Sequence, residues 1–172
     1  MKNIIAIILM VSTVFASSKT IAVSYFDNTS KLEEYMPLSK GLSDMLITDL
    51  SNIESVRIVE REKLESLLKE IELGASKFMD PATAQKLGRG LGADHMLTGS
   101  FLIMGESMRI DARIVNVGTG EISMAEEMTG EKDTFFELEK QLVEKLITAL
   151  DLDVTRSEKR KLNKVQTESF ES

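Results

Sequence analysis

His95 is the only histidine in this 172-residue chain, so chemistry that needs an imidazole has one place to occur. A histidine side chain can act as a general base or a metal ligand near neutral pH. Here it stands in an apolar stretch between Asp94 and Met96, with no second histidine to complete a metal site. This setting is more typical of a structural histidine at a strand edge, which is our interpretation of His95.

Gly88, Gly90 and Gly92 form a glycine-rich run that superficially resembles a phosphate-binding loop. Such a loop joins a strand to the N-terminus of a helix, so that free N–H groups face the anion. These glycines lie instead at the C-terminal end of a predicted helix, where exposed carbonyls and the helix dipole repel anions. We therefore interpret the run as helix termination and close packing.

Acidic side chains are numerous, and the sequence pattern places them on solvated faces. Glu60, Glu62 and Glu65 fall at the start of a predicted helix, where the helix dipole stabilises negative charge. A catalytic acid and base pair would need one desolvated carboxyl group, which a sequence alone does not show. The ten methionines fall mostly at core-facing positions rather than in a soft binding surface. We therefore expect no catalytic, cofactor-binding or metal-binding residues, and no cofactor.

The composition excludes several classes of function. The net charge of -7 argues against nucleic acid as a partner, because phosphates require a basic surface. The chain contains no cysteine. Disulfides, thiolate metal sites, a cysteine nucleophile and a lipid-modified N-terminal cysteine are therefore all excluded.

Residues 1–16 have the pattern of a cleavable signal peptide. Lys2 supplies the positive region, residues 4–11 are continuously apolar, and residues 14–16 suit a signal peptidase. An uncleaved membrane anchor is the alternative, but the apolar run is shorter than the roughly 20 residues that a spanning helix needs. We expect cleavage after Ala16 and a periplasmic mature chain with no membrane span.

The spacing of apolar residues predicts five strands and four helices. Alternation between Met108 and Ile114 indicates a strand with one buried face. Asp80 followed by Pro81 indicates a helix start, because an N-cap carboxylate precedes proline at the first helical position. The strands are predicted at 21–26, 56–59, 95–104, 108–117 and 121–128, and the helices at 37–53, 61–74, 81–91 and 133–150.

This order predicts the α/β class, with one compact domain over residues 19–150. Early helices between strands imply parallel crossovers, and three late strands joined by short turns imply an antiparallel meander. The expected architecture is a mixed sheet of about five strands covered by about four helices. Residues 151–172 are expected to form a charged tail, partly disordered or with a short helix supported by Val154, Leu162 and Val165.

Three motifs resemble the curli-secretion-channel family, here called CsgG-like. They are VEREKLESLLKE at 59–70, DPATAQKLG at 80–88 and LGADHMLTGS at 91–100. The opening strand and turn at 21–28 and the hairpin RIVNVGTGEI at 113–122 also match the family pattern. The resemblance spans about residues 21–150 and is specific at the level of the family.

The resemblance implies a periplasmic α/β domain that associates with outer-membrane or cell-wall assemblies. Similar domains occur in flagellar accessory proteins, in outer-membrane activators of peptidoglycan synthases and at the N-terminus of TolB, and none is known as an enzyme. Arg61 and the run Thr98–Gly99–Ser100 match family positions that look structural, a helix start and a place of tight strand packing. The chain lacks the channel's lipid-anchoring cysteine and its long membrane hairpins, so we infer the domain without the pore.

The favoured function is a non-enzymatic interaction module of a bacterial cell-envelope system, such as curli-type secretion, motility or wall synthesis. Its partner would be an outer-membrane or peptidoglycan-associated protein complex, and the module could also form homo-oligomers. The first alternative is a small outer-membrane secretion pore. The second is a carboxylate-dependent glycan hydrolase, which would need two carboxyl groups converging in a cleft.

Overall fold

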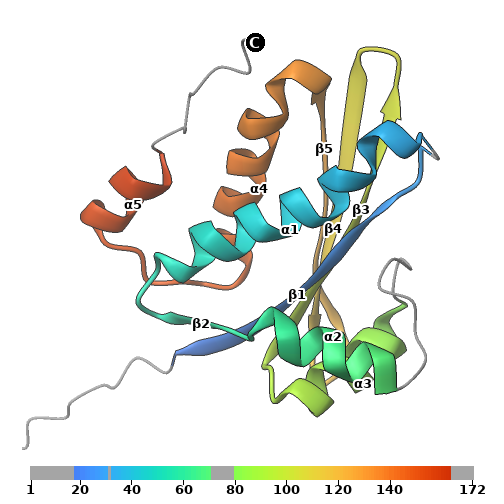
Figure 1. The fold of residues 1–172 in the computed structure, drawn as a ribbon. Helices are drawn as coiled ribbons and strands as arrows, with labels where there is room; N and C mark the ends of the chain where they lie inside the picture. The colour runs from blue at the N-terminus through green and yellow to red at the C-terminus, as the bar shows by residue number, and fades with distance from the viewer. Residues whose placement is uncertain (1–17, 31, 71–79, 164–172) are drawn as a thin grey trace, which may run out of the picture.

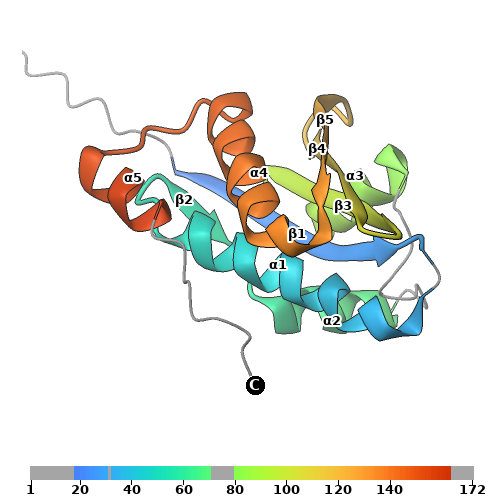
Figure 2. The same cartoon turned by 90° about the horizontal axis from the view of Figure 1, so that it is seen from above.

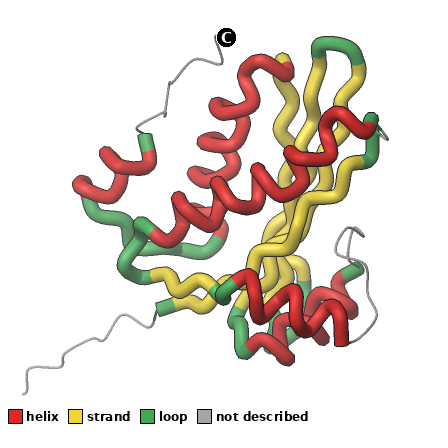
Figure 3. Tube along the Cα trace, in the orientation of Figure 1, coloured by secondary structure: helices red, strands yellow, loops and turns green. Residues whose placement is uncertain are grey.

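The computed structural model describes residues 18–30, 32–70 and 80–163, which form five strands and five α-helices. The strands are β1 (Lys19–Asn28), β2 (Val56–Ile58), β3 (His95–Met104), β4 (Ser107–Asn116) and β5 (Ile122–Glu131). They make one mixed sheet in the order β2-β1-β3-β4-β5 (Figures 1 and 3). The predicted α/β class and mixed sheet are confirmed.

The sheet has a parallel half and an antiparallel half, as the sequence predicted. β1 lies between β2 and β3 and is parallel to both. β3, β4 and β5 form an antiparallel meander in which β3 and β4 pair without interruption from His95 opposite Asn116 to Met104 opposite Ser107. Gly105 has a φ of +60° at the first central position of the two-residue β3–β4 turn, where a type II′ hairpin turn favours glycine.

Helices cover both faces of the sheet (Figure 2). α1 (Met36–Ser51) and α4 (Phe135–Ala149) pack on one face, together with α5 (Arg156–Leu162). α2 (Arg61–Glu70) and α3 (Pro81–Leu91) pack on the other face, at the end where β1 and β3 begin. Short 3₁₀ turns at Glu33–Tyr35 and Lys132–Thr134 lead into α1 and α4.

The period-two pattern of the strands assigns side chains to two separate cores. Even-numbered β4 residues such as Ile110 and Ile114 face α1 and α4, whereas Val115 and Val117 face α2 and α3. The larger core includes Phe26, Phe101, Leu46 and Leu142, each fully buried. Helices therefore bury both faces where the parallel strands begin, whereas Arg109 of β4 is exposed on the second face near the β3–β4 turn.

The part of the chain after Asp151 contains α5, in addition to the four helices expected. A capping box at Thr155 and Glu158 starts this helix. Glu158 also accepts a hydrogen bond of 2.7 Å from the backbone N–H of Glu54, and Leu162 is buried against the main core. Residues 1–17, 31, 71–79 and 164–172 lie outside the described residues, and so do the predicted signal peptide, the predicted end of the helix from Arg61, and Val165.

Gly99 of β3 leaves room for the Phe26 side chain of the neighbouring strand β1. A Cβ atom at this position would collide with the ring of Phe26 and would lie 2.6 Å from the carbonyl oxygen of Asp111. The predicted role of Thr98–Gly99–Ser100 in tight strand packing therefore holds for the glycine. Gly41 in α1 is different, because a Cβ there would meet no described atom within 4 Å.

These two glycines predict opposite effects of the same substitution. Gly99→Ala should lower the free energy of unfolding by about 2–3 kcal/mol, because overpacking forces the buried ring and backbone apart. Gly41→Ala should raise it by about 1 kcal/mol, because alanine stabilises a helix relative to glycine. Urea unfolding of both variants measures the difference, and two shifts of equal sign would contradict this account.

Candidate functional site

His95 begins β3 and is half-buried beside Lys19. Burial lowers its pKa, the nearby charge of Lys19 lowers it further, and the charge of Asp94 opposes both. The Asp94 carboxylate accepts a hydrogen bond of 2.7 Å from the backbone N–H of Thr20. The structure thus gives a neutral imidazole next to a lysine, and the interpretation of His95 as structural stays a prediction.

The glycine run lies where the sequence placed it, at the C-terminal end of α3. Gly92 adopts the left-handed conformation (φ +66°, ψ +30°) that ends the helix. Cβ atoms at Gly88 and Gly90 would collide with Val117 and Leu67, so both glycines permit close packing of α3. Helix termination and close packing are confirmed for this run.

The acidic cluster at the start of α2 is only partly solvated. Glu60 and Glu62 are exposed, as expected. Glu65 is only partly exposed to solvent, and its carboxylate accepts a hydrogen bond from the Tyr25 hydroxyl.

Arg61 stacks over the Tyr25 ring, 4.5 Å from its centroid, and forms a 2.7 Å ion pair with Asp44. Burial and the bond to Glu65 raise the pKa of Tyr25. These contacts join α2 to β1 and α1.

The expectation that carboxylates lie on solvated faces is wrong for Glu139 of α4. Its residue is 0% exposed, and neither carboxylate oxygen has a hydrogen-bond partner among the described residues. Lys140 Nζ lies 3.5 Å from Glu139 Oε2 and is also paired with Asp49 of α1. Burial raises the pKa of Glu139 to about 7, the charge of Asp49 contributes, and Lys140 opposes the shift.

The sequence does not reveal the buried Glu139 carboxylate, because Glu139 is flanked by Leu138 and Lys140 in an ordinary amphipathic helix pattern. Its burial depends on α1 packing against α4, which brings Asp49 and Lys140 together from positions 91 residues apart. Among the described residues, no group of three or more His, Cys, Asp or Glu side chains could hold a metal ion.

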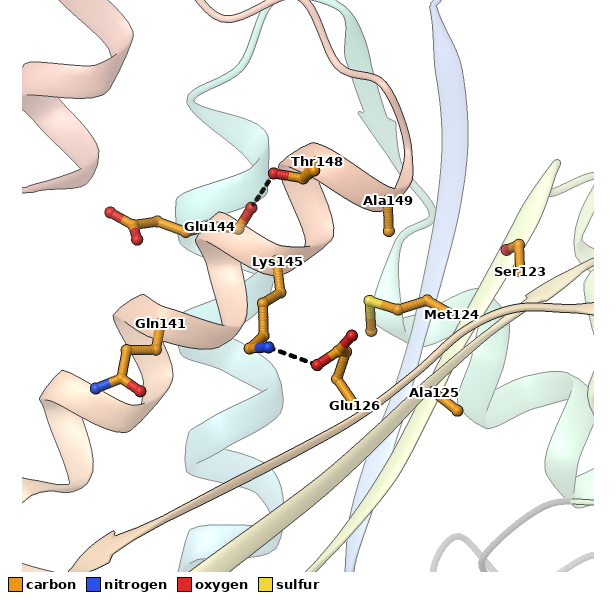
Figure 4. A pocket seen from close by; sticks show the side chains of 9 residues that line it. All are labelled: Ser123, Met124, Ala125, Glu126, Gln141, Glu144, Lys145, Thr148 and Ala149. Carbon is orange, nitrogen blue, oxygen red and sulfur yellow. Dashed lines mark hydrogen bonds and ion pairs between the residues drawn. The ribbon is translucent and has the colours of Figure 1, made fainter.

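A cleft of about 720 Å³ separates β5 from the second half of α4 (Figure 4). Glu126 of β5 and Lys145 of α4 form an ion pair across it, with Met124 beside them. Gln141 and Glu144 lie along its outer side. β5 is the last strand of the sheet, so no strand among the described residues pairs with its outer edge.

Comparison with known proteins decides the family. The family described as "Curli production assembly/transport component CsgG" matches residues 7–106, more than half of the chain. The chain belongs to the CsgG family. The resemblance inferred from the motifs at 59–70, 80–88 and 91–100 is therefore confirmed.

Solved structures share the fold of this CsgG-family chain at low sequence identity. The LpoB C-terminal domain from Salmonella enterica has a TM-score of 0.56 and 16% identity, covering 67% of this chain and 84% of that one. TolB from Acinetobacter baumannii has a TM-score of 0.55 and 14% identity, covering 78% of this chain and 28% of that one. The predicted similarity to TolB-like domains is therefore confirmed for the fold.

A curated relative shares sequence over most of the chain. It is "Putative adenylate cyclase 3" of Rhizobium meliloti, 26% identical over 155 residues. The match covers 88% of this chain but 25% of that protein, so this chain spans about a quarter of its relative. Within the described residues, no helix has the length and apolar character needed to cross a membrane.

The buried Glu139 predicts a stability that falls as pH rises. Between pH 4.5 and about 7 the folded chain keeps a proton on Glu139 that the unfolded chain has lost. Because the folded chain binds one proton more than the unfolded chain, raising the pH across that interval lowers the free energy of unfolding by about 3 kcal/mol. Glu139→Gln should remove this cost, so the variant should be more stable than the parent by about 2–3 kcal/mol at pH 8 and nearly equal to it at pH 4.5.

Glu144→Gln is the matched control, because Glu144 is an exposed residue of the same helix. Urea unfolding at both pH values should show no comparable gain for the control. A Glu139→Gln variant with the same effect at pH 4.5 and pH 8 would disprove the assigned protonation.

Proposed function

We propose that this chain is a non-enzymatic accessory module of a bacterial cell-envelope system and acts by binding protein partners. Membership of the CsgG family carries the proposal, because that family is described as a component of curli production, assembly and transport. The signal-peptide pattern of residues 1–16 supports export to the periplasm. Curli-type secretion, motility and wall synthesis are the processes in which such a module would serve.

The open edge of β5 is the surface that best supports partner binding. Nine of its ten residues pair with β4, all but Ser123, and its other edge pairs with no strand among the described residues. The strand carries Glu126, Glu127 and Glu131 and no cationic residue. Glu126 is paired with Lys145 and Glu127 with Arg109, so these two charges are largely offset. An extended segment added at this edge would therefore bind mainly through backbone hydrogen bonds, with basic side chains favoured only weakly. The net charge of the whole chain favours the same class of partner.

A hydrolase is supported less well by the arrangement of carboxyl groups. Asp49 and Glu139 lie close together and one of them has a raised pKa, which is the electrostatic pattern that such an enzyme needs. However, Glu139 is fully buried between α1 and α4, so a glycan could reach it only if the helices separated. Absence of enzymatic activity remains part of the proposal.

Site-specific photo-cross-linking in living cells tests the proposal. A benzophenone amino acid at Gln141, beside the β5–α4 cleft, should cross-link a processed periplasmic chain to an envelope protein. The same group at Lys86, exposed on α3 on the opposite helical layer, is the control and should give at least fivefold less of that product. Fractionation of a tagged native copy and mass spectrometry identify the compartment and partner.

Cytoplasmic retention of the unprocessed chain would contradict the proposal. Recovery only in detergent, as a large homo-oligomer, would instead favour the secretion-pore alternative. Equal cross-linking from both positions would leave the β5–α4 cleft without a role in recognition.

A further inference from the structure

A second surface feature lies at the other end of α4, away from the cleft in Figure 4. A cavity of about 390 Å³ opens between the first half of α1, the tip of the β3–β4 hairpin and the start of α4. We call it the α1–hairpin groove, and its apolar lining includes Leu38, Met45, Ile103, Met108 and Phe136. At the ends of the same elements Met36 and Met104 are 50% and 68% exposed. Apolar surface is thus concentrated here.

Gly41 forms part of this groove and has no structural reason to be glycine. It lies inside α1, where glycine is about 1 kcal/mol less favourable than alanine. A Cβ atom at Gly41 would meet no described atom within 4 Å, whereas Cβ atoms at Gly88 and Gly99 would collide with neighbours. The missing side chain therefore leaves the groove open. An unfavourable residue that keeps an apolar groove empty indicates that the space is used.

The charged residues at the groove and next to it in sequence have an acidic excess. Asp133 lines it, and Glu33 and Glu34 precede the lining residue Tyr35 in an exposed 3₁₀ turn. Lys132 also lines the groove, but its Nζ is 3.1 Å from a carboxylate oxygen of Glu106, which offsets its charge. Exposed Lys40, next to Gly41 in sequence, opposes the acidic excess only in part. A ligand with positive charge around an apolar centre would be complementary to this border.

We propose that the α1–hairpin groove binds one leucine or phenylalanine side chain carried by a lysine- or arginine-rich segment of a protein partner. The buried apolar side chain would provide most of the affinity, as in other interfaces with one central anchor. The flanking cations would speed association and select against acidic segments. The existence of a natural partner rests on the proposed function, whereas the chemistry of the groove does not.

A second copy of this chain is a poorer occupant. The basic segment that the structure describes is α5, with Arg156, Lys159, Arg160 and Lys161. The apolar residue of that helix, Leu162, is already buried against its own core. The basic helix of a second copy would therefore bring charge without a free apolar anchor.

Methyl NMR of the purified protein labelled at its methionines tests the proposal. The probes are three peptides with blocked ends: KKLFKK, EELFEE and KKSSKK. KKLFKK should shift the methyl signals of Met45 and Met108, in the groove, and leave those of Met96 and Met124, which lie elsewhere in the two cores, unchanged. EELFEE and KKSSKK should each bind at least tenfold more weakly.

Three variants locate the effect. Gly41→Leu fills the groove at a helical position and should weaken KKLFKK binding at least tenfold, whereas Gly41→Ala, the matched control, should change it less than threefold. The double variant Glu33→Lys with Glu34→Lys alters exposed border charges only. It should weaken KKLFKK binding and strengthen EELFEE binding, even if Gly41→Leu fails to fold.

The proposal is overturned if KKLFKK causes no shift at Met45 and Met108 up to 10 mM, or if EELFEE binds equally well. It is also overturned if Gly41→Leu folds and binds like the parent. Shifts of these methyls with protein concentration alone would identify a second copy as the occupant. If no envelope partner is found in cells, the proposed function fails, but the peptide measurements still test the groove on their own.

Discussion

Phe26 of β1 occupies the space that a side chain at position 99 of β3 would fill, and this contact joins the two halves of the sheet. On one side of it lie the parallel strands and the crossover through α1, and on the other lies the antiparallel meander. β1 also changes register with β3 between Val23 and Phe26, so the ring reaches the centre of the larger core. The positions of α1 and of the hairpin tip, and hence the α1–hairpin groove, depend on this junction.

Charged groups between elements add specificity to the apolar packing. Tyr25, Arg61 and Glu65 connect α2 to β1, whereas Asp49, Glu139 and Lys140 lie where α1 meets α4. In the first group Tyr25 donates to Glu65 and Arg61 is paired with Asp44, although Nη1 of Arg61 has no hydrogen-bond partner among the described residues. Neither carboxylate oxygen of Glu139 has such a partner, and burial destabilises its charged form. Such a group constrains the α1–α4 packing although it adds no stability at high pH.

Local patterns predicted most of the fold, and distant contacts explain what they missed. Alternation in β4, the Asp80 cap and the glycine stop at Gly92 are local, so they were visible in the sequence. The burial of Glu139 and the bond of Glu65 to Tyr25 require knowledge of which helices and strands meet across tens of residues. The α1–hairpin groove likewise combines three distant segments. Gly41, a glycine inside a strong helical pattern, was the one local signal that could have indicated it.

The position of β1 has a kinetic consequence. It is the first strand in the chain, yet it lies between β2 and β3, with Ile21 aligned to His95. The meander of β3, β4 and β5 is joined by short turns, so it can assemble from neighbouring residues within microseconds. β1 can pair with β2 across the shorter span from Lys19 to Val56, but it must close a loop of more than 70 residues to pair with β3, so loop entropy places the joining of the two halves late in folding. Until then the inner edge of β3 is exposed, and the chain can be captured or can aggregate through that edge.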